Sequence, residues 1–504
     1  MEVVQGLGGS ELPGFQWGGN VKRCFALGPK TLSDHGWLCE NRTMSQINEP
    51  GFSHASFHGW MGLGHKDITP PVGIYARNWG AAKHDVADSI HRCLVLKTLT
   101  LATSSDEVPL VFIDADLGWW RTPETYRQFS IRLLEELALP PEKLIFALSH
   151  THSAPPLMEM DEELPGSEIL GEWRENLFQA AFQAVQEARE NSFEGVLDWG
   201  KGTCNLASFR DFPDPDPQRN RVVCGYNPEG KPDDTLLVGR LTDSTGRIRA
   251  TLTHYACHPT TLAHQNTAIS PDYVGAMRDT LQELTGAPAL FMLGACGDLA
   301  PRYQYVGDLD VADRHGQQLA FATMAALQGM EPACTRLEYV NTVESGASLA
   351  IWQHRPRELP RELRVIQTSV SLPLKDWPVA KELERQRQAC SDRTLEERLR
   401  RKRDIRRGIG DGTGYDLPLY VWSLGEAVLV GCCCEAYSVL QEELRRRFPQ
   451  LTLVCMNLIN GSIGYLPPVE CYDQELYPVW QTPFDQGSLE RLLEAMTDAI
   501  RRIT

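Results

Sequence analysis

The sequence predicts an α/β fold in which mixed, largely parallel sheets are flanked by helices. From about Trp60 onward, short apolar runs that indicate buried strands alternate with helical patterns, as is typical of this architecture. No repeat of solenoid or propeller length is present. The length of 504 residues allows roughly two to four folding units, and we expect a polar extension over residues 1–56 and one large domain over residues 57–504.

The first well-marked helix begins after Thr122. Threonine is a favourable N-cap, and Pro123 suits the first helical position, where no backbone N–H is needed. Leucines through Leu137 give the helix an apolar face, and the prolines at 140 and 141 end it.

A strand, helix and second strand follow one another in the middle of the chain. Residues 248–255 form an apolar run, residues 272–284 carry apolar side chains at helical spacing, and Gly286 can end that helix. The apolar run 289–293 then predicts the next strand. This is the unit on which the α/β prediction depends most.

Residues 382–407 are dense in arginine and glutamate. Such a segment is typical of a solvated surface helix with ion pairs along it. We therefore expect this segment to be a surface helix without a functional role.

The charge and the cysteines limit the class of protein. Lys and Arg number 49 and Asp and Glu 66, and the net charge of −17 excludes nucleic-acid partners and favours neutral substrates. The longest apolar runs, such as residues 427–434, are far shorter than the ~20 residues that cross a bilayer. The N-terminus has no pattern of a secretory signal, and the 14 cysteines include no C-x-x-C pair, so we expect reduced thiols and a cytoplasmic location.

Two histidines follow the apolar run 144–148, at His150 and His152. Side chains at positions i and i+2 of an extended segment share a face, so both imidazoles can reach one point in space. Imidazole is the commonest protein ligand for metals, although two surface or capping histidines would give the same pattern.

A second strand ends in the same way, at His258. His254 falls within the strand and is expected to be packed or hydrogen-bonded, whereas His258 stands where the strand gives way to a loop. Cys257 points away from its neighbour and is expected to be a buried free thiol. His258 is therefore the better candidate ligand.

Oxygen ligands follow two later strands. The apolar run 427–430 leads to Glu435, and the run 451–456 leads to Tyr465. A carboxylate in an apolar neighbourhood needs a cation or strong donors nearby. The alternative for Glu435 is an acid at a helix N-terminus, where the helix dipole favours it.

With these segments in order, the chain from about Trp60 to about Trp480 resembles the catalytic domain of the neutral ceramidases, zinc amidases that hydrolyse N-acyl-sphingosine. The resemblance rests on residues 64–71, 149–155, 256–262, 270–273, 297–301 and 464–468. It implies that His150, His258, Glu435 and Tyr465 bind one Zn²⁺ per chain and that His152 lies beside the metal-bound water. It also implies that Arg210 and Tyr477 contact the transition state.

One departure from the family pattern bears on the substrate. The family's Gly-Asp-Val-Ser-Pro-Asn is Gly297 to Arg302 here, with Ala300 in place of the serine. The chain also ends at Thr504, before the β-sandwich that follows the catalytic domain in ceramidases. The expected substrate is therefore an amide other than ceramide.

The sequence thus predicts a zinc-dependent hydrolase that cleaves a linear amide bond of a small molecule by a zinc-activated water. One alternative keeps the metal but cleaves an ester, a lactam or a sugar-derived group, because a family resemblance indicates a site better than a substrate. The other is a non-catalytic binding protein with a fully ligated metal. The oligomeric state is not predicted.

Overall fold

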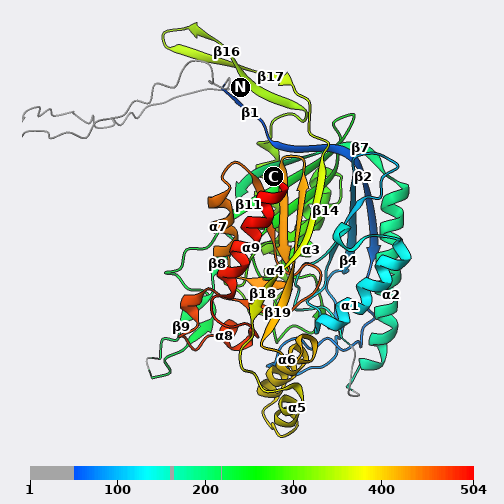
Figure 1. Ribbon diagram of the computed structural model, residues 1–504, viewed down its shortest axis with the longest axis vertical. Helices are drawn as coiled ribbons and strands as arrows, with labels where there is room; N and C mark the ends of the chain where they lie inside the picture. The colour runs from blue at the N-terminus through cyan, green and yellow to red at the C-terminus, as the bar shows by residue number, and fades with distance from the viewer. Residues whose placement is uncertain (1–49, 159–163, 217) are drawn as a thin grey trace, which may run out of the picture. The chain divides into compact units, whose positions relative to one another are not determined.

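Two β-sheets lie at the centre of the computed structural model, which describes residues 50–158, 164–216 and 218–504 (Figure 1). The larger sheet contains, in spatial order, β14 (Ala289–Leu293), β12 (Ile248–Tyr255), β11 (Thr235–Asp243), β7 (Phe193–Thr203), β2 (Ala55–Asp67), β4 (Val95–Ala102), β5 (Leu110–Ala115) and β6 (Leu144–Leu148). The smaller sheet contains β18 (Leu363–Pro373), β19 (Gly414–Leu424), β20 (Ala427–Cys432) and β22 (Thr452–Met456). Residues 1–49, most of the expected extension, lie outside the described residues.

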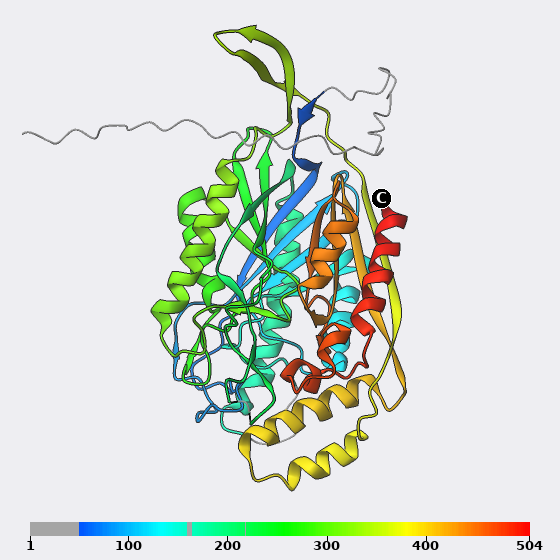
Figure 2. The same cartoon turned by 90° about the vertical axis from the view of Figure 1, so that its left-hand side faces the viewer.

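Helices cover the outer face of each sheet. The helices of the described residues are α1 (Pro123–Leu137), α2 (Leu170–Glu190), α3 (Tyr273–Thr285), α4 (Leu309–Gln328), α5 (Ala380–Gln388), α6 (Arg393–Ile409), α7 (Val439–Arg447), α8 (Tyr477–Gln481) and α9 (Ser488–Ile503). Helices α2 and α4 pack on the larger sheet, and α7 and α9 pack on the smaller one. Figure 2 shows α3 and α4, in green, on one side of the strands and α9, in red, on the other. The order of layers is helix, sheet, sheet, helix.

Short strands complete the described structure. They are β1 (Gly51–Phe52) with β16 (Thr335–Glu344) and β17 (Ser348–Pro356), β3 (Ser89–Ile90) with β13 (Ala268–Ile269), β8 (Ala207–Phe209) with β15 (Leu299–Pro301), β9 (Asp211–Pro213) with β10 (Val222–Cys224), and β21 (Cys434–Ala436) with β23 (Gly464–Leu466). The last pair lies directly after the strands of the smaller sheet in the chain.

The alternation of side chains in the strands produces these layers. In β5, Leu110 and Phe112 belong to the core between the two sheets, while Val111 and Ile113 belong to the core beneath the helices. Successive side chains of a strand point to opposite faces, so a continuous apolar run is needed when both faces are covered. The apolar runs of the sequence correspond to strands of this kind.

The mixed α/β class is confirmed, but the prediction of largely parallel sheets is confirmed only in part, because most strand pairs are antiparallel. In the larger sheet only the two edge pairs, β12 with β14 and β5 with β6, are parallel, and in the smaller sheet only β20 with β22 is. Each parallel pair is joined through a helix, as parallel strands require. The interior strands pair antiparallel, as β11 and β12 do across a tight turn, and sequence alternation does not distinguish such pairs.

The expected helix ends are confirmed. The hydroxyl of Thr122 accepts the backbone N–H of Thr125 at 3.0 Å, with Pro123 as the first residue of α1. Asp272 caps α3, and Gly286 ends that helix at φ 67°, a left-handed conformation that glycine adopts without strain.

A buried ion pair joins the two edges of the larger sheet, whose edge strands β6 and β14 contact each other. Arg278 of α3 donates to both oxygens of Asp114 in β5, at 2.6 and 2.8 Å, and to Asp116 at 3.0 Å. The backbone N–H of Phe291 in β14 donates to Asp114 at 2.8 Å. Strand ends that are far apart in the sheet order are thereby held close in space.

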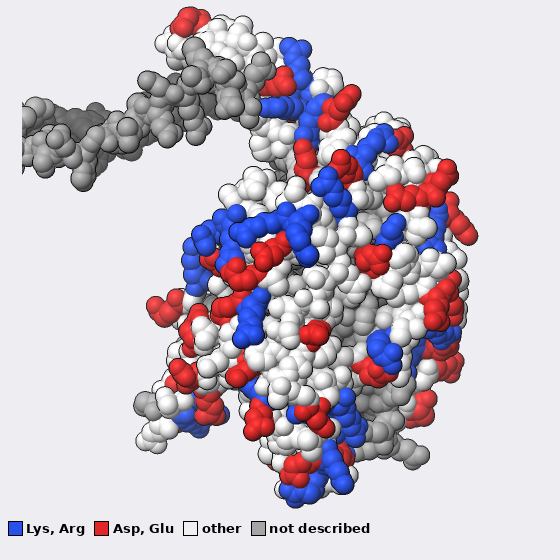
Figure 3. Space-filling model, viewed as in Figure 1, with Lys and Arg blue, Asp and Glu red and all other residues white. Residues whose placement is uncertain are grey.

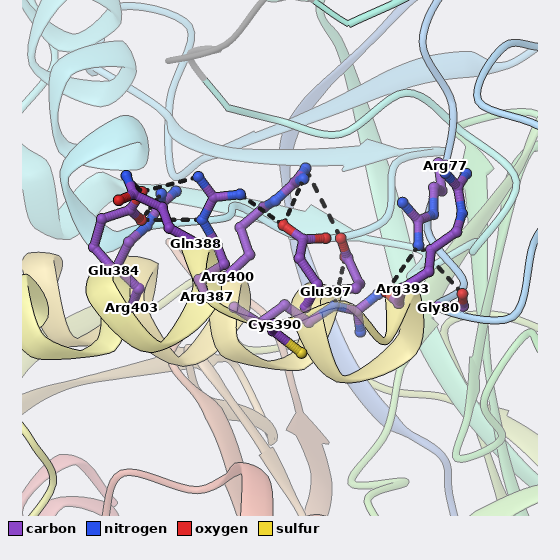
Figure 4. Close-up of polar contacts among 12 residues, drawn as sticks. Arg77, Gly80, Glu384, Arg387, Gln388, Cys390, Arg393, Glu397, Arg400 and Arg403 are labelled. Atoms are coloured by element: carbon purple, nitrogen blue, oxygen red, sulfur yellow. Dashed lines mark hydrogen bonds and ion pairs between the residues drawn. The ribbon is translucent and has the colours of Figure 1, made fainter.

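The arginine-rich segment is a hairpin of two helices, α5 and α6, and not one solvated helix. Asp392 caps α6 by accepting the backbone N–H of Leu395 at 2.8 Å. The expected ion pairs are present, but many are buried, and Arg403 is only 1% exposed. Figure 4 shows Glu384 and Arg403 among the side chains that converge on the inner side of the hairpin. Charge-rich composition predicted the pairing, whereas the burial depends on the packing of α5 and α6 against each other and of α6 against α1.

The charges on the outer surface are mixed in sign. Figure 3 shows acidic and basic side chains interspersed over the viewed face. Within the part of the chain that the structure describes, no helix combines the length and apolarity needed to cross a bilayer.

Candidate metal centre

His150 follows β6 and is held in an unusual backbone conformation. Its φ of 70° lies in the left-handed region, which costs free energy for a residue other than glycine. Its backbone N–H donates to Leu117 at 2.9 Å, and its Nδ1 lies 3.0 Å from the carbonyl oxygen of Gly118. Because a carbonyl only accepts, Nδ1 carries the proton and Nε2 presents a lone pair.

His258 is held in the same tautomer. Its Nδ1 lies 2.6 Å from the carbonyl oxygen of Cys296 and 3.1 Å from that of Leu299, so its Nε2 also presents a lone pair. His254 is buried and pairs with the carbonyl oxygen of Cys455 at 2.7 Å, as expected of a hydrogen-bonded core histidine. Cys257 is a buried free thiol outside the metal-binding group.

Glu435 and Tyr465 lie side by side because β21 and β23 are parallel and pair these two residues directly. The Oε2 atom of Glu435 lies 3.3 Å from His150 Nε2 and 3.0 Å from His258 Nε2. The Tyr465 hydroxyl lies 3.5 Å from His258 Nε2. Glu435 belongs to a strand, and α7 begins only at Val439, so the interpretation as a helix N-terminal acid is not supported.

The donor atoms of this group fit a cation. The ligand atoms of His150, His258 and Glu435 all lie within 4.8 Å of one another, and all three residues are buried. Burial lowers the pKa of His258 to about 3, so this imidazole is neutral. Although burial alone would raise the pKa of Glu435, the adjacent histidines hold it well below the usual range. Two imidazole nitrogens and a carboxylate oxygen therefore converge in a buried place, and this set of donor atoms suits a divalent metal.

His152 lies beside this group but is not one of its ligands. Its ring lies 4.8 Å from that of His150, between Trp79 at 5.0 Å and Trp119 at 4.9 Å. Neither ring nitrogen has a hydrogen-bond partner among the described residues. Burial holds the pKa of His152 well below its usual value, so the ring is a neutral base.

Arg210 and Tyr477 approach from the Tyr465 side. The guanidinium of Arg210 lies 5.4 Å from the centre of the Tyr465 ring and donates to the carbonyl oxygen of Gly297 at 2.7 Å. Its Nε is buried without a partner among the described residues. The Tyr477 ring lies 5.8 Å from that of Tyr465. The structure thus brings all seven sequence-predicted site residues together, while their individual roles stay predictions.

A pocket of about 740 Å³ opens onto this group, which is large enough for a drug-sized ligand. Its walls include residues that the sequence analysis did not identify, among them Trp79, Trp119, Tyr305, Arg398, Arg401 and Trp480. Trp119 follows β5, the parallel neighbour of β6, so its position at a strand end was a signal that could have been used. For the arginines on α6 the sequence held no such signal.

Ala300 lies in β15 and is fully buried. It pairs with Ser208 of β8, whose hydroxyl donates to the Ala300 carbonyl oxygen at 2.9 Å. Ala300 does not belong to the lining of the described pocket.

The architecture is similar to that of solved ceramidases. A ceramidase complexed with C2 matches with a TM-score of 0.63 at 15% sequence identity, over 89% of this chain and 76% of that chain. The neutral ceramidase from Pseudomonas aeruginosa matches with a TM-score of 0.61 at 16% identity, over 90% of this chain and 75% of that chain. No family model matches the sequence, and no curated protein does. At these identities the similarity shows the fold, and the expected ceramidase-like architecture is confirmed.

Proposed function

We propose that the protein is a zinc-dependent amidohydrolase that cleaves a linear N-acyl bond of a small molecule. The observation that carries the proposal is the convergence of three buried donor atoms, from His150, His258 and Glu435, beside a pocket of about 740 Å³. The ceramidase fold supports the choice of reaction class, and the mixed nitrogen and oxygen donor set supports zinc.

His150, His258 and Glu435 would hold the metal, with the Tyr465 hydroxyl as the fourth group. Zinc, when bound, polarises a carbonyl and lowers the pKa of water toward neutrality. The hydrogen bonds from Nδ1 of each histidine to backbone carbonyls fix the orientation of the imidazoles.

His152 is placed to accept and return a proton. Its ring is neutral, lies beside the donor group and has both nitrogens free of partners among the described residues. A general base needs these properties, and proton transfer by a placed side chain typically contributes about 100- to 10,000-fold in rate.

Arg210 and Tyr477 are the donors for the oxyanion that develops on the amide carbonyl. Arg210, whose Nε has no partner among the described residues, and Tyr477 both lie beside the Tyr465 ring. Loss of one such donor typically costs about 3 to 4 kcal/mol of transition-state stabilisation.

The described cysteines are all free thiols, which supports a reducing compartment such as the cytoplasm. We place the reaction there.

The test is elemental analysis of the purified protein, followed by a hydrolysis assay against N-acyl amines of varied chain length. We expect one zinc per chain and release of a free amine from at least one substrate. A fully loaded protein that cleaves none of these amides, while binding them, would favour a binding protein instead.

A further inference from the structure

The α5–α6 hairpin supplies part of the pocket wall. Arg398 and Arg401, both on α6, line the pocket together with Trp480 of α8. Figures 1 and 2 place this hairpin at the opposite end of the described unit from β16 and β17. The hairpin is therefore part of the substrate site and not only a surface feature.

Most arginines of the hairpin are neutralised by carboxylates. Arg387 pairs with Glu384 at 2.9 Å, Arg403 pairs with the same carboxylate at 2.6 Å, and Arg400 pairs with Glu396 at 3.0 Å. Figure 4 shows these side chains turned toward one another along the hairpin. Their charges are therefore balanced by carboxylates within the fold.

Arg398 differs from them. It is exposed and, among the residues that the structure describes, forms no ion pair with a carboxylate. Its guanidinium lies 5.6 Å from the centre of the Tyr477 ring and 5.5 Å from that of Trp480. Ring contacts hold an arginine in place without neutralising it, and leave its donors available.

The position of Arg398 relates it to the reacting centre. The Tyr477 ring beneath it lies 5.8 Å from Tyr465, which contacts His258. The guanidinium is thus separated from the metal-binding group by two aromatic rings. Arg398, His150 and Glu435 line the same pocket.

The rest of this wall is also cationic. Glu397 is the shared partner of Arg121 at 3.3 Å and Arg401 at 3.0 Å, so one carboxylate faces two arginines there. The guanidinium of Arg401 lies 5.0 Å from the Trp119 ring. Local charge in a cleft bordered by protein acts on a ligand more strongly than distant surface charge, so the net charge of −17 does not decide which ligand fits.

We propose that Arg398 binds an anionic group at the far end of the substrate, so that the preferred substrates are N-acyl amides bearing a carboxylate or sulfonate. This inference rests on the proposed hydrolysis, and it names the class of amide that is cleaved. Guanidinium matches the geometry of an oxyanion with two parallel donors, and such charge-assisted hydrogen bonds are stronger than neutral ones.

The test compares three amides with the same acyl chain: N-octanoylglycine, N-octanoyltaurine and the neutral N-octanoylethanolamine. Release of the amine is measured on the zinc-loaded full chain, and binding is measured separately by quenching of tryptophan fluorescence. We expect kcat/KM for the preferred acidic amide to exceed that for the neutral amide by about tenfold or more. The two acidic amides distinguish a carboxylate site from a sulfonate site.

The variants are Arg398→Gln, Arg398→Lys and the control Arg249→Gln. We expect Arg398→Gln to bring the acidic-to-neutral ratio close to one, mainly through KM, and Arg398→Lys to retain only part of the ratio, because the charge remains but the two parallel donors are lost. Arg249 also stacks on a ring, at 4.2 Å from Phe193, but stands near the start of β12 and outside the pocket lining. Its substitution should leave the ratio as in the parent protein.

The outcomes separate this inference from the proposed function. If the neutral amide is cleaved as well as the acidic ones, or if Arg398→Gln leaves the ratio unchanged, the assignment of Arg398 is overturned while hydrolysis stands. If no amide is cleaved but the acidic amides bind and lose affinity in Arg398→Gln, the anion site stands and the proposed hydrolysis fails. Absence of both binding and cleavage overturns both.

Discussion

His254 and His258 are buried imidazoles four residues apart, and they differ in what their Nε2 atoms contact. Nε2 of His254 is bound to the carbonyl oxygen of Cys455, whereas Nε2 of His258 points at the carboxylate of Glu435. Nε2 of the first imidazole therefore has its partner within the fold. The second needs a cation, and this contrast gives a matched pair of variants.

We predict that His258→Ala abolishes stable zinc binding, while His254→Gln retains it. Removal of a direct ligand should weaken zinc binding by more than the roughly 10- to 100-fold typical of losing an outer partner. Zinc content after dialysis, measured by elemental analysis, checks this. A chelator should lower the thermal midpoint of the parent protein but not of His258→Ala, because a bound metal stabilises only the state that binds it. Full zinc content in His258→Ala contradicts the site.

His152→Ala should leave zinc content unchanged and reduce kcat by about 100- to 10,000-fold. This ring lies beside the candidate zinc ligands and is the proposed proton acceptor. Paired measurement of zinc content and kcat checks the prediction. Equal loss of zinc in His152→Ala and His258→Ala would make His152 a ligand.

Ala300→Ser should not create ceramide hydrolysis, because Ala300 is fully buried and outside the pocket lining. The added hydroxyl enters a packed site, so we expect a stability loss of about 1 to 3 kcal/mol with zinc content nearly unchanged. Denaturant titration and a ceramide assay of both proteins test this. Robust ceramide turnover by either protein would refute the expectation.

The candidate metal-binding group could be predicted from the sequence because each of its residues follows an apolar run that forms a strand. His150 and Glu435 stand at such positions, and the chain itself marks them. The pocket walls could not be predicted in the same way. Arg398 belongs to a charge-rich helix like many solvated ones, and only the packing of that helix places it at the pocket.

At the scale of elements, the residues of the candidate metal centre follow strands that belong to parallel pairs. The two candidate ligand histidines follow β6 and β12. Each of these strands belongs to the parallel pair at one edge of the larger sheet. The sequence analysis identified the unit of β12, α3 and β14 correctly. It did not predict the antiparallel interior, since pairing direction there depends on turns and on partners far away in the chain.

The buried ion pair of α3 is expected to stabilise this arrangement. Arg278→Leu would leave the carboxylates of Asp114 and Asp116 buried without their cation. Removing one member of such a group typically costs about 3 to 5 kcal/mol, which we expect in urea titration. The control Arg132→Leu removes an arginine from an exposed pair with Glu175 and should change stability little. Equal effects would show that the burial of Arg278 is not what matters.

At the scale of the whole molecule, buried carboxyls make stability depend on pH. Burial raises the pKa of Asp272 from 3.8 to about 6. Well below pH 4 this carboxyl is protonated in both folded and unfolded chains and does not lower the free energy of unfolding. Between pH 4 and about pH 6 the unfolded chain ionises first, so this group destabilises the fold increasingly, to about 3 kcal/mol at most.

We therefore predict that the unfolding free energy of the parent protein, relative to Asp272→Asn, falls between pH 4 and pH 7. Asparagine has no carboxyl to ionise, so the difference between the two proteins isolates this group. Denaturant titrations at three pH values measure it. A difference that does not change with pH would contradict the raised pKa.

The ligands of the candidate metal centre come from widely separated parts of the chain, and Glu435 stands 285 residues after His150. During synthesis, the ribosome produces both histidines long before Glu435 and Tyr465. A nascent chain that has folded its first strands therefore has two imidazoles but lacks the carboxylate that completes the donor set. If the group binds zinc as proposed, metal capture would be a late event of biogenesis, limited to chains that have been translated past Tyr465 and have brought both sheets together.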